Sequence, residues 1–121
     1  MSRAAHSLKV FAGYLAILSI VLVFAPNLLL TTFGFPATTE IWIRVLGLVV
    51  FNVAIYYWFA AKSEAKPFFL ASVYARAFIL LAFVALAVLG LAQPMLVLFG
   101  AVDTLGGIWT FISMRRDEAV V

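Results

Sequence analysis

Four long apolar stretches, separated by short polar connections, restrict the folds open to this chain more than any other feature. They cover residues 8–25, 41–61, 68–92 and 95–114. A helix needs about 20 consecutive, mostly apolar residues to cross the hydrocarbon core of a bilayer. Because each stretch meets or approaches that length, the sequence predicts four transmembrane helices.

Composition excludes the alternatives to a membrane protein. Hydrophobic residues make up 67% of the 121 residues and charged residues only 11%, whereas a soluble domain carries about 25% charged residues. A soluble protein of this size could not bury so much apolar surface. We therefore expect one all-α transmembrane domain over residues 1–121, surrounded by membrane lipid and with no nucleic-acid partner.

Basic residues predict how the chain is oriented. The connections at residues 26–40 and 93–94 contain neither Lys nor Arg. If the chain crosses four times, six basic residues fall on the opposite side: Arg3, Lys9, Lys62, Lys66, Arg115 and Arg116. Cytoplasmic segments of membrane proteins are enriched in Lys and Arg. The pattern predicts an antiparallel four-helix bundle, multi-pass in a bacterial inner membrane, with both termini cytoplasmic.

The first apolar stretch has a second interpretation, because two basic residues followed by such a stretch also begin a signal peptide. Pro26 directly after Ala25 disfavours cleavage there, so we interpret the stretch as a retained span. The connection that follows, residues 26–40, contains Gly and Pro within an apolar segment. This composition favours a re-entrant or surface-lying turn.

Three ionisable residues lie inside the predicted spans, namely Arg44, Arg76 and Asp103. Each costs about 2.5–3.5 kcal/mol on the insertion scale, so each needs a partner or a function. With a rise of about 1.5 Å per residue, Arg76 and Asp103 reach similar depths on helices joined by a short turn. We therefore predict an Arg76–Asp103 ion pair. Arg44 either joins this pair or extends outward to Glu40.

Two further polar residues extend this predicted intramembrane polar cluster. Asn52 and Tyr56 follow Arg44 at multiples of four on the second helix, so they lie on one side of it. Three interpretations of the cluster stay open. It is a packing clamp between helices, a proton relay or substrate-binding carboxylate, or an oligomer contact.

Small and polar residues repeat along the fourth span. Gly100, Gly107 and Thr110 stand with Asp103 at spacings of three and four. Small residues let helices approach closely in lipid, where the hydrophobic effect does not drive them together. We interpret Gly100, Gly107 and Thr110 as helix-packing positions.

Aromatic residues near the ends of the spans are typical of an interfacial belt. A sharper alternative is a pocket for a quinone or a sterol, lined by Tyr56, Tyr74 and Trp109. His6, just before the first span, is interpreted as an interfacial residue. These two interpretations of the aromatic residues predict different ligands for the chain, membrane lipid alone or a lipid-soluble molecule.

No pattern of residues indicates catalysis. The chain has no Cys and one His, which excludes thiolate and multi-His metal sites. Within the spans we consider Asp103, Tyr56 and Tyr74 as a candidate acid or base. We expect no catalytic residue, no metal and no cofactor, and hence a protein that is not an enzyme.

Motifs in three of the four spans carry a resemblance to a known family. They are Arg44-x-x-Gly47 opening the second span, a lone Arg76 in the third, and Asp103-x-x-Gly106-x-x-Trp109-Thr110 in the fourth. In these motifs the chain resembles the small bacterial four-helix membrane proteins grouped as DoxX-like. The resemblance implies a four-helix membrane fold and a role as a subunit of membrane redox complexes, including quinone-linked ones.

Together these features predict a small, non-catalytic integral membrane protein. We expect it to act as an accessory subunit or as a binding module for a lipid-soluble ligand such as a quinone, in a homo-oligomer or a larger membrane complex. The alternative is a small-solute or proton-coupled transporter or channel that uses Asp103. A loss of flux on replacing Asp103 by Asn, with the fold intact, is the result that favours transport.

Overall fold

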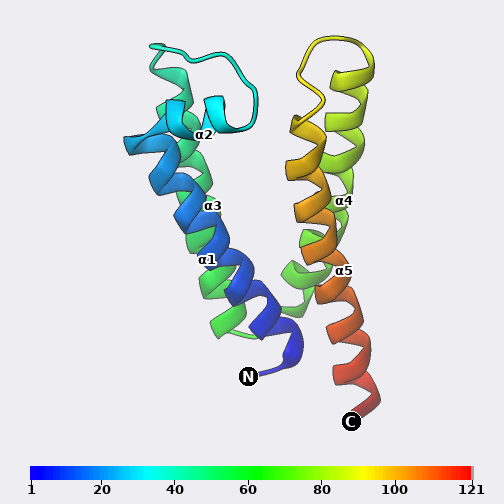
Figure 1. Ribbon diagram of the computed structural model, residues 1–121. Helices are drawn as coiled ribbons and strands as arrows, with labels where there is room; N and C mark the ends of the chain where they lie inside the picture. The colour runs from blue at the N-terminus through cyan, green and yellow to red at the C-terminus, as the bar shows by residue number, and fades with distance from the viewer. Residues whose placement is uncertain (121) are drawn as a thin grey trace.

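The computed structural model describes residues 1–120 of the chain, and every regular element in this range is an α-helix, which confirms the predicted all-α class. All of the helices except the second are long and apolar enough to cross a membrane. In chain order (Figure 1) they are α1 (Arg3–Phe24), α2 (Pro26–Thr32), α3 (Trp42–Lys62), α4 (Lys66–Val88) and α5 (Leu96–Val120).

The helices begin and end where local backbone chemistry dictates, which differs in places from the predicted spans. α1 begins at Arg3, because the Ser2 hydroxyl accepts a hydrogen bond from the amide of Ala5 and caps the helix. α4 ends at Val88, shortly before Gly90, which has a φ of +75°. Glycine adopts this left-handed conformation at little cost and commonly ends helices. The connection between α4 and α5 is therefore longer than the two residues predicted.

The connection between the first two spans contains the short helix α2, which begins at Pro26. Proline is favoured at the first helical position because the amide it lacks would be unpaired there. The side-chain oxygen of Asn27 accepts a hydrogen bond of 2.8 Å from the amide of Thr38, which closes the loop back on α2. At its far end the ring of Phe33 lies 5.0 Å from that of Phe99 on α5.

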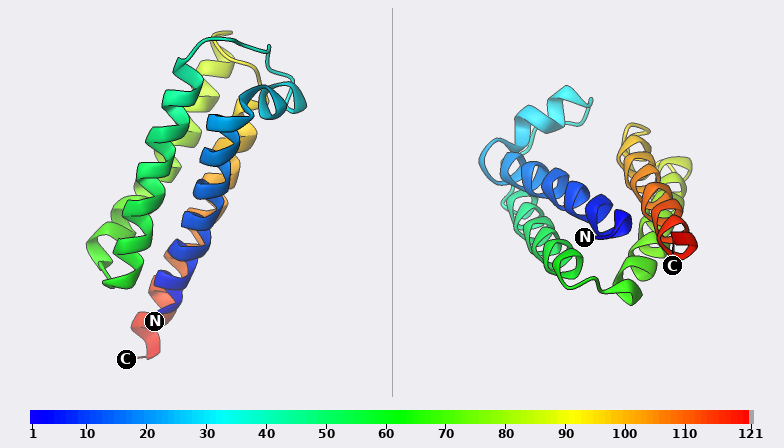
Figure 2. Two further views of the ribbon diagram at one scale, coloured as in Figure 1. Left: turned by 90° about the vertical axis from the view of Figure 1, so that its left-hand side faces the viewer. Right: turned by 90° about the horizontal axis from the view of Figure 1, so that it is seen from below.

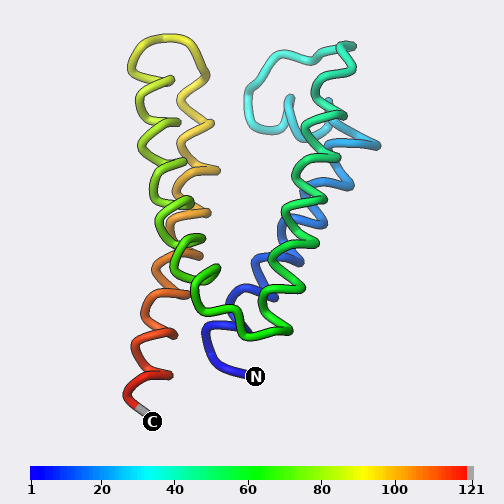
Figure 3. The backbone as a smooth tube through the Cα atoms, turned by 180° about the vertical axis from the view of Figure 1, so that it is seen from behind, coloured from blue at the N-terminus to red at the C-terminus, as the bar shows by residue number. Residues whose placement is uncertain are grey.

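The long helices form two hairpins. α1 packs along α3, α4 packs along α5, and contacts between α1 and α5 join the two pairs, as the views along and across the bundle show (Figures 1 and 2). The hairpins converge at the end that carries the N-terminus and diverge toward α2 (Figure 3). The main hydrophobic core accordingly lies at the converging end and includes Leu8, Phe11, Tyr57, Ala61 and Phe69.

α1 and α3 approach each other closely at Gly47. A Cβ atom at this position would lie 2.9 Å from both Leu22 Cβ and Val23 Cγ2, and 3.1 Å from the carbonyl oxygen of Ser19. Only a residue without a side chain fits this contact. The first hairpin is thus held by van der Waals packing, which in lipid replaces the hydrophobic effect as the source of helix association.

At the converging end, two carboxylates from distant parts of the chain bind the N-terminus of α1. Asp117 on α5 accepts hydrogen bonds from the amides of Arg3 and Ala4 at 3.2 and 3.1 Å. Glu64, between α3 and α4, accepts from the amide and hydroxyl of Ser2 at 2.7 and 2.6 Å. The first amides of a helix have no partner inside the helix, and its positive end favours anions. These contacts, the α1 clamp, tie all four long helices together.

The α1 clamp predicts a dependence of stability on pH. The hydrogen bond from the Ser2 hydroxyl is the main cause that lowers the pKa of Glu64. A lowered folded-state pKa stabilises the protein above the unfolded value of about 4.3, and this stabilisation is lost as pH falls through the folded-state pKa. Unfolding in detergent should therefore become easier between about pH 5 and pH 3. Glu64→Gln should weaken that dependence, whereas Glu118→Gln, at an exposed position on α5, should leave it unchanged.

Candidate polar site between the two hairpins

Arg76 is the one charged residue whose whole side chain is buried within the described range, with 3% of its surface exposed. Its Nε donates to the carbonyl oxygen of Ser72 at 3.1 Å, one turn earlier on α4. Its Nη2 donates to the hydroxyls of Ser72 and Thr110 at 2.9 and 3.0 Å. Its Nη1 is buried and has no hydrogen-bond partner among residues 1–120. The guanidinium is therefore incompletely bonded.

Aromatic rings surround the guanidinium of Arg76. Its Cζ lies 4.7 Å from the ring centroid of Phe11 on α1 and 5.6 Å from that of Tyr57 on α3. Such cation–π contacts are worth about 2 kcal/mol or more when water is excluded. Gly106 leaves space for the group, because a Cβ there would lie 3.2 Å from Arg76 Nη1. The site is thus built from α1, α3, α4 and α5 together.

Thr110 connects this arginine to α1. The Thr110 side chain is fully buried, and its hydroxyl lies 2.8 Å from that of Ser7 and 3.1 Å from the carbonyl oxygen of Gly106. Because it also accepts from Arg76 Nη2, one hydroxyl links three helices. A hydrogen bond to a charged group contributes about 1.5–3 kcal/mol, so Thr110 does more than provide a small surface for helix packing.

The predicted Arg76–Asp103 ion pair is not formed, and the polar contacts of Arg76 are to Ser72 and Thr110 instead. The reason is the direction of the side chain. Long helical side chains point toward the N-terminus of their own helix, which takes the guanidinium away from Asp103. Thr110, which it reaches, lies seven residues or about 10 Å further along α5 than Asp103. The predicted ion pair depended on the similar depths of the two backbone positions and not on the direction of the Arg76 side chain.

Asp103 lies at the same α1–α5 contact, two turns from Thr110. Ser7 packs opposite Thr110 and Phe11 opposite Gly106, so the same register places Asp103 opposite Tyr14. Asp103 is only partly buried, and no hydrogen bond or ion pair to it occurs within the described part of the chain. Its carboxyl group is available to a ligand or a proton.

The other members of the predicted polar cluster lie elsewhere. Arg44, Asn52 and Tyr56 are exposed on α3, and Arg44 Nη1 donates to the carbonyl oxygen of Val23. The helix face that packs on α1 carries Tyr57, so Tyr57 and not Tyr56 reaches Arg76. The structure therefore brings Arg76 and Asp103 to one contact between helices but leaves the three α3 residues outside it.

Two glycines that were interpreted as packing positions lie against α4. A Cβ at Gly100 would lie 3.0 Å from Leu80 Cα, and a Cβ at Gly107 would lie 3.6 Å from Arg76 Cβ. Gly100 therefore allows a close backbone approach, whereas Gly107 has room for a methyl group. Both residues are buried at the contact between α4 and α5.

The aromatic residues proposed as a quinone pocket do not meet. Tyr56 and Tyr74 are exposed, and the ring of Trp109 contacts that of His6 edge-on at 6.2 Å. A different set gathers beside Arg76, in which the ring of Phe11 lies 5.5 Å from the rings of both Tyr14 and Tyr57. The two members of this set on α1 could have been identified from the sequence. Phe11 and Tyr14 follow Ser7 at helical spacings of four and three, which places the three residues on one face of the helix.

Comparison with protein-family models, with curated proteins and with solved structures gives no match for this chain. The chemistry of the site is therefore taken from its own geometry. It offers a buried N–H donor on Arg76, a partly buried carboxyl group on Asp103, and three aromatic rings beside Arg76. Among the described residues no group of three or more His, Cys, Asp or Glu side chains could hold a metal ion.

Proposed function

We propose that this chain is a non-catalytic integral membrane protein that binds a lipid-soluble molecule with a polar head between its two hairpins. The observation that carries the proposal is the buried Arg76 Nη1, a charged donor without an acceptor among residues 1–120. Leaving such a donor unpaired costs about 1–3 kcal/mol or more. A ligand oxygen at this position would recover that cost, which gives the site its affinity.

The surroundings of Arg76 define the class of ligand. Nη1 is buried, and neither the pockets at the converging end nor the one between α1 and α3 reaches it. A head group must therefore be flat, and the flanking rings of Phe11 and Tyr57 must shift to admit it. Asp103 can accept a hydrogen bond from a hydroxyl on the same head group. A quinone head group supplies the carbonyl oxygen when oxidised and the hydroxyl when reduced, and its apolar tail would extend into lipid.

A titration with decylubiquinone tests this proposal, with the tryptophan fluorescence of the purified protein in detergent as the readout. We expect saturable quenching, and we expect Arg76→Met to weaken the binding of decylubiquinone by about tenfold, which is the loss of one good polar contact. Asp103→Asn should weaken by a similar factor the binding of the reduced form, decylubiquinol, which carries the hydroxyl that Asp103 accepts from. Tyr56→Phe, at an exposed position outside the site, is the matched control. Quenching without saturation, or an equal loss in the control, would contradict the proposal.

A second candidate function rests on Asp103 itself. A partly buried carboxyl group with no partner in the described residues is also what a proton-coupled transporter or channel requires. Proton flux into liposomes that contain the protein distinguishes this function from simple binding. Flux that is present in the original protein and absent in Asp103→Asn would replace the binding proposal by the transport one.

We propose a bacterial inner-membrane location, and the arrangement of charges supports an orientation with both termini in the cytoplasm. The six basic residues that predicted the orientation lie in the segments near the converging end of the hairpins, on α1, α3, α4 and α5. Arg44, in the first turn of α3, is the basic residue that lies near the opposite end, beside α2. Under the positive-inside rule the converging end faces the cytoplasm.

Asn52, an amide exposed midway along α3, supports assembly with a second copy or a partner subunit, because an unpaired amide is unfavourable in lipid.

A further inference from the structure

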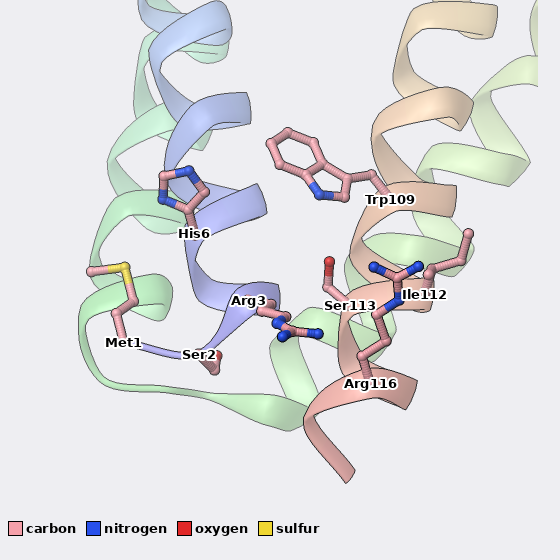
Figure 4. A pocket seen from close by; sticks show the side chains of 8 residues that line it. All are labelled: Met1, Ser2, Arg3, His6, Trp109, Ile112, Ser113 and Arg116. Atoms are coloured by element: carbon pink, nitrogen blue, oxygen red, sulfur yellow. The ribbon is translucent and has the colours of Figure 1, made fainter. Parts of the chain in front are cut away.

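A second polar site lies apart from Arg76, at the converging end of the bundle. It is a pocket of about 570 Å³ between the first turns of α1 and the last turns of α5. Figure 4 shows the two arginine side chains of this pocket, Arg3 and Arg116, on either side of Ser113. His6, Trp109 and Ile112 continue the lining toward the middle of the helices.

Ser113 gives this pocket a polar group on the wall formed by α5. The residue is only 4% exposed, and its hydroxyl makes no hydrogen bond to any of residues 1–120. In Figure 4 the hydroxyl points into the pocket rather than toward a helix backbone. Because this hydroxyl faces the pocket, it can form a hydrogen bond with a ligand oxygen there.

The charges at this end of the bundle are separated by sign. Glu64 and Asp117 are engaged with the amides of Ser2, Arg3 and Ala4 in the α1 clamp. No Asp or Glu lines the pocket. Neither of its two guanidinium groups donates a hydrogen bond or forms an ion pair within the described range. The pocket is therefore cationic, and two guanidinium groups with a hydroxyl match the oxygens of a phosphate.

The apolar part of the lining indicates that the phosphate belongs to a lipid. Trp109 lies six residues, or about 9 Å, before the basic pair at the end of α5, at the depth where tryptophan marks the membrane interface. Ile112 continues the same wall. We propose that this pocket binds the phosphate of an anionic phospholipid, with its acyl chains running along α5 past Trp109. This inference does not depend on the proposed function of the Arg76 site.

Native mass spectrometry of the purified protein in detergent, titrated with phosphatidylglycerol or phosphatidylcholine, tests this proposal. A Lys or Arg that contacts the head group of an anionic lipid contributes about fivefold in affinity. We therefore expect Arg116→Gln to weaken phosphatidylglycerol binding by about fivefold or more, and the Arg3→Gln/Arg116→Gln double variant by more than about tenfold. The matched control is Arg115→Gln, whose guanidinium lies 5.8 Å from the Phe111 ring and outside the pocket. It should change affinity by less than about twofold.

Ser113→Ala is a second variant, which keeps every charge and should weaken phosphatidylglycerol binding by about threefold or more through the lost hydroxyl. Equal losses in Arg115→Gln and Arg116→Gln would overturn the proposal, because they would show attraction to the basic surface in general. Equal binding of phosphatidylcholine would overturn it as well. Displacement of phosphatidylglycerol by low millimolar inorganic phosphate would assign the pocket to a free anion instead of a lipid.

Discussion

Replacing Gly47 by leucine is expected to separate α1 from α3 and to have the largest effect on stability of any single substitution considered. A Cβ there would lie 2.9 Å from two side-chain atoms and 3.1 Å from a backbone oxygen of α1, and the remaining atoms of a leucine would have to displace the helix. Overpacking a well-packed contact costs about 1–3 kcal/mol and sometimes more. We expect a loss of about 3 kcal/mol or more, measured as the free energy of unfolding in mixed detergent micelles.

Gly13→Leu is the matched control for that experiment. Gly13 lies on α1, and a Cβ there would have no heavy atom within 4 Å. Leucine also favours a helix over glycine by up to about 1 kcal/mol. The control should therefore unfold at the same or a slightly higher detergent concentration. If both variants lose the same stability, the cause is a general effect of leucine and not the contact between α1 and α3.

The second large effect is expected at Thr110, where valine has nearly the same shape but no hydroxyl. Thr110→Val removes the bond from Arg76 Nη2 and the one to Ser7, and it leaves a buried cation with fewer partners. We expect a loss of about 2–3 kcal/mol in the free energy of unfolding. The conservative comparison is Thr104→Val, because Thr104 makes only a 3.4 Å contact to the carbonyl oxygen of Arg76; it should lose less than about 1 kcal/mol.

A double-mutant cycle assigns that loss to the charge. Arg76→Met removes the cation, its unpaired Nη1 and the cost of burying them, so this variant should fold with nearly unchanged stability. In the Arg76→Met background, Thr110→Val should cost less than about 1 kcal/mol, which gives a coupling of about 1 kcal/mol or more. Additive losses would show that Thr110 stabilises the bundle by packing alone.

The long helices were predictable from the sequence because a bilayer sets a minimum length and an apolar composition for each span. Which face of each helix packs against its neighbours was not predictable. α3 is apolar on most of its circumference, so its hydrophobic pattern does not show which side packs on α1. Tyr56 and Tyr57 differ by one residue, or about 100° around the helix, and only the contact with α1 decides that Tyr57 faces Arg76.

The site was predicted in part. Arg76 and Asp103 were identified as unusual because charges inside spans are costly, and both lie at the contact between the hairpins. Their pairing was wrong, since it depended on the direction of a long side chain as well as on depth. The α1 clamp was missed entirely, because Glu64 and Asp117 resemble ordinary surface residues in the sequence and are separated from α1 by most of the chain. The resemblance to DoxX-like proteins stays a prediction.

The α1 clamp also has a consequence for how the protein is made. The amide of Arg3 binds a carboxylate that lies 114 residues later, so at about 5–20 residues per second the ribosome needs roughly 6–23 s to deliver the partner. During that interval the nascent first hairpin can associate through Gly47 and Glu64, which are synthesised early. Arrival of Asp117 then completes the last contact of the first helix, so full assembly waits until α5 has been synthesised.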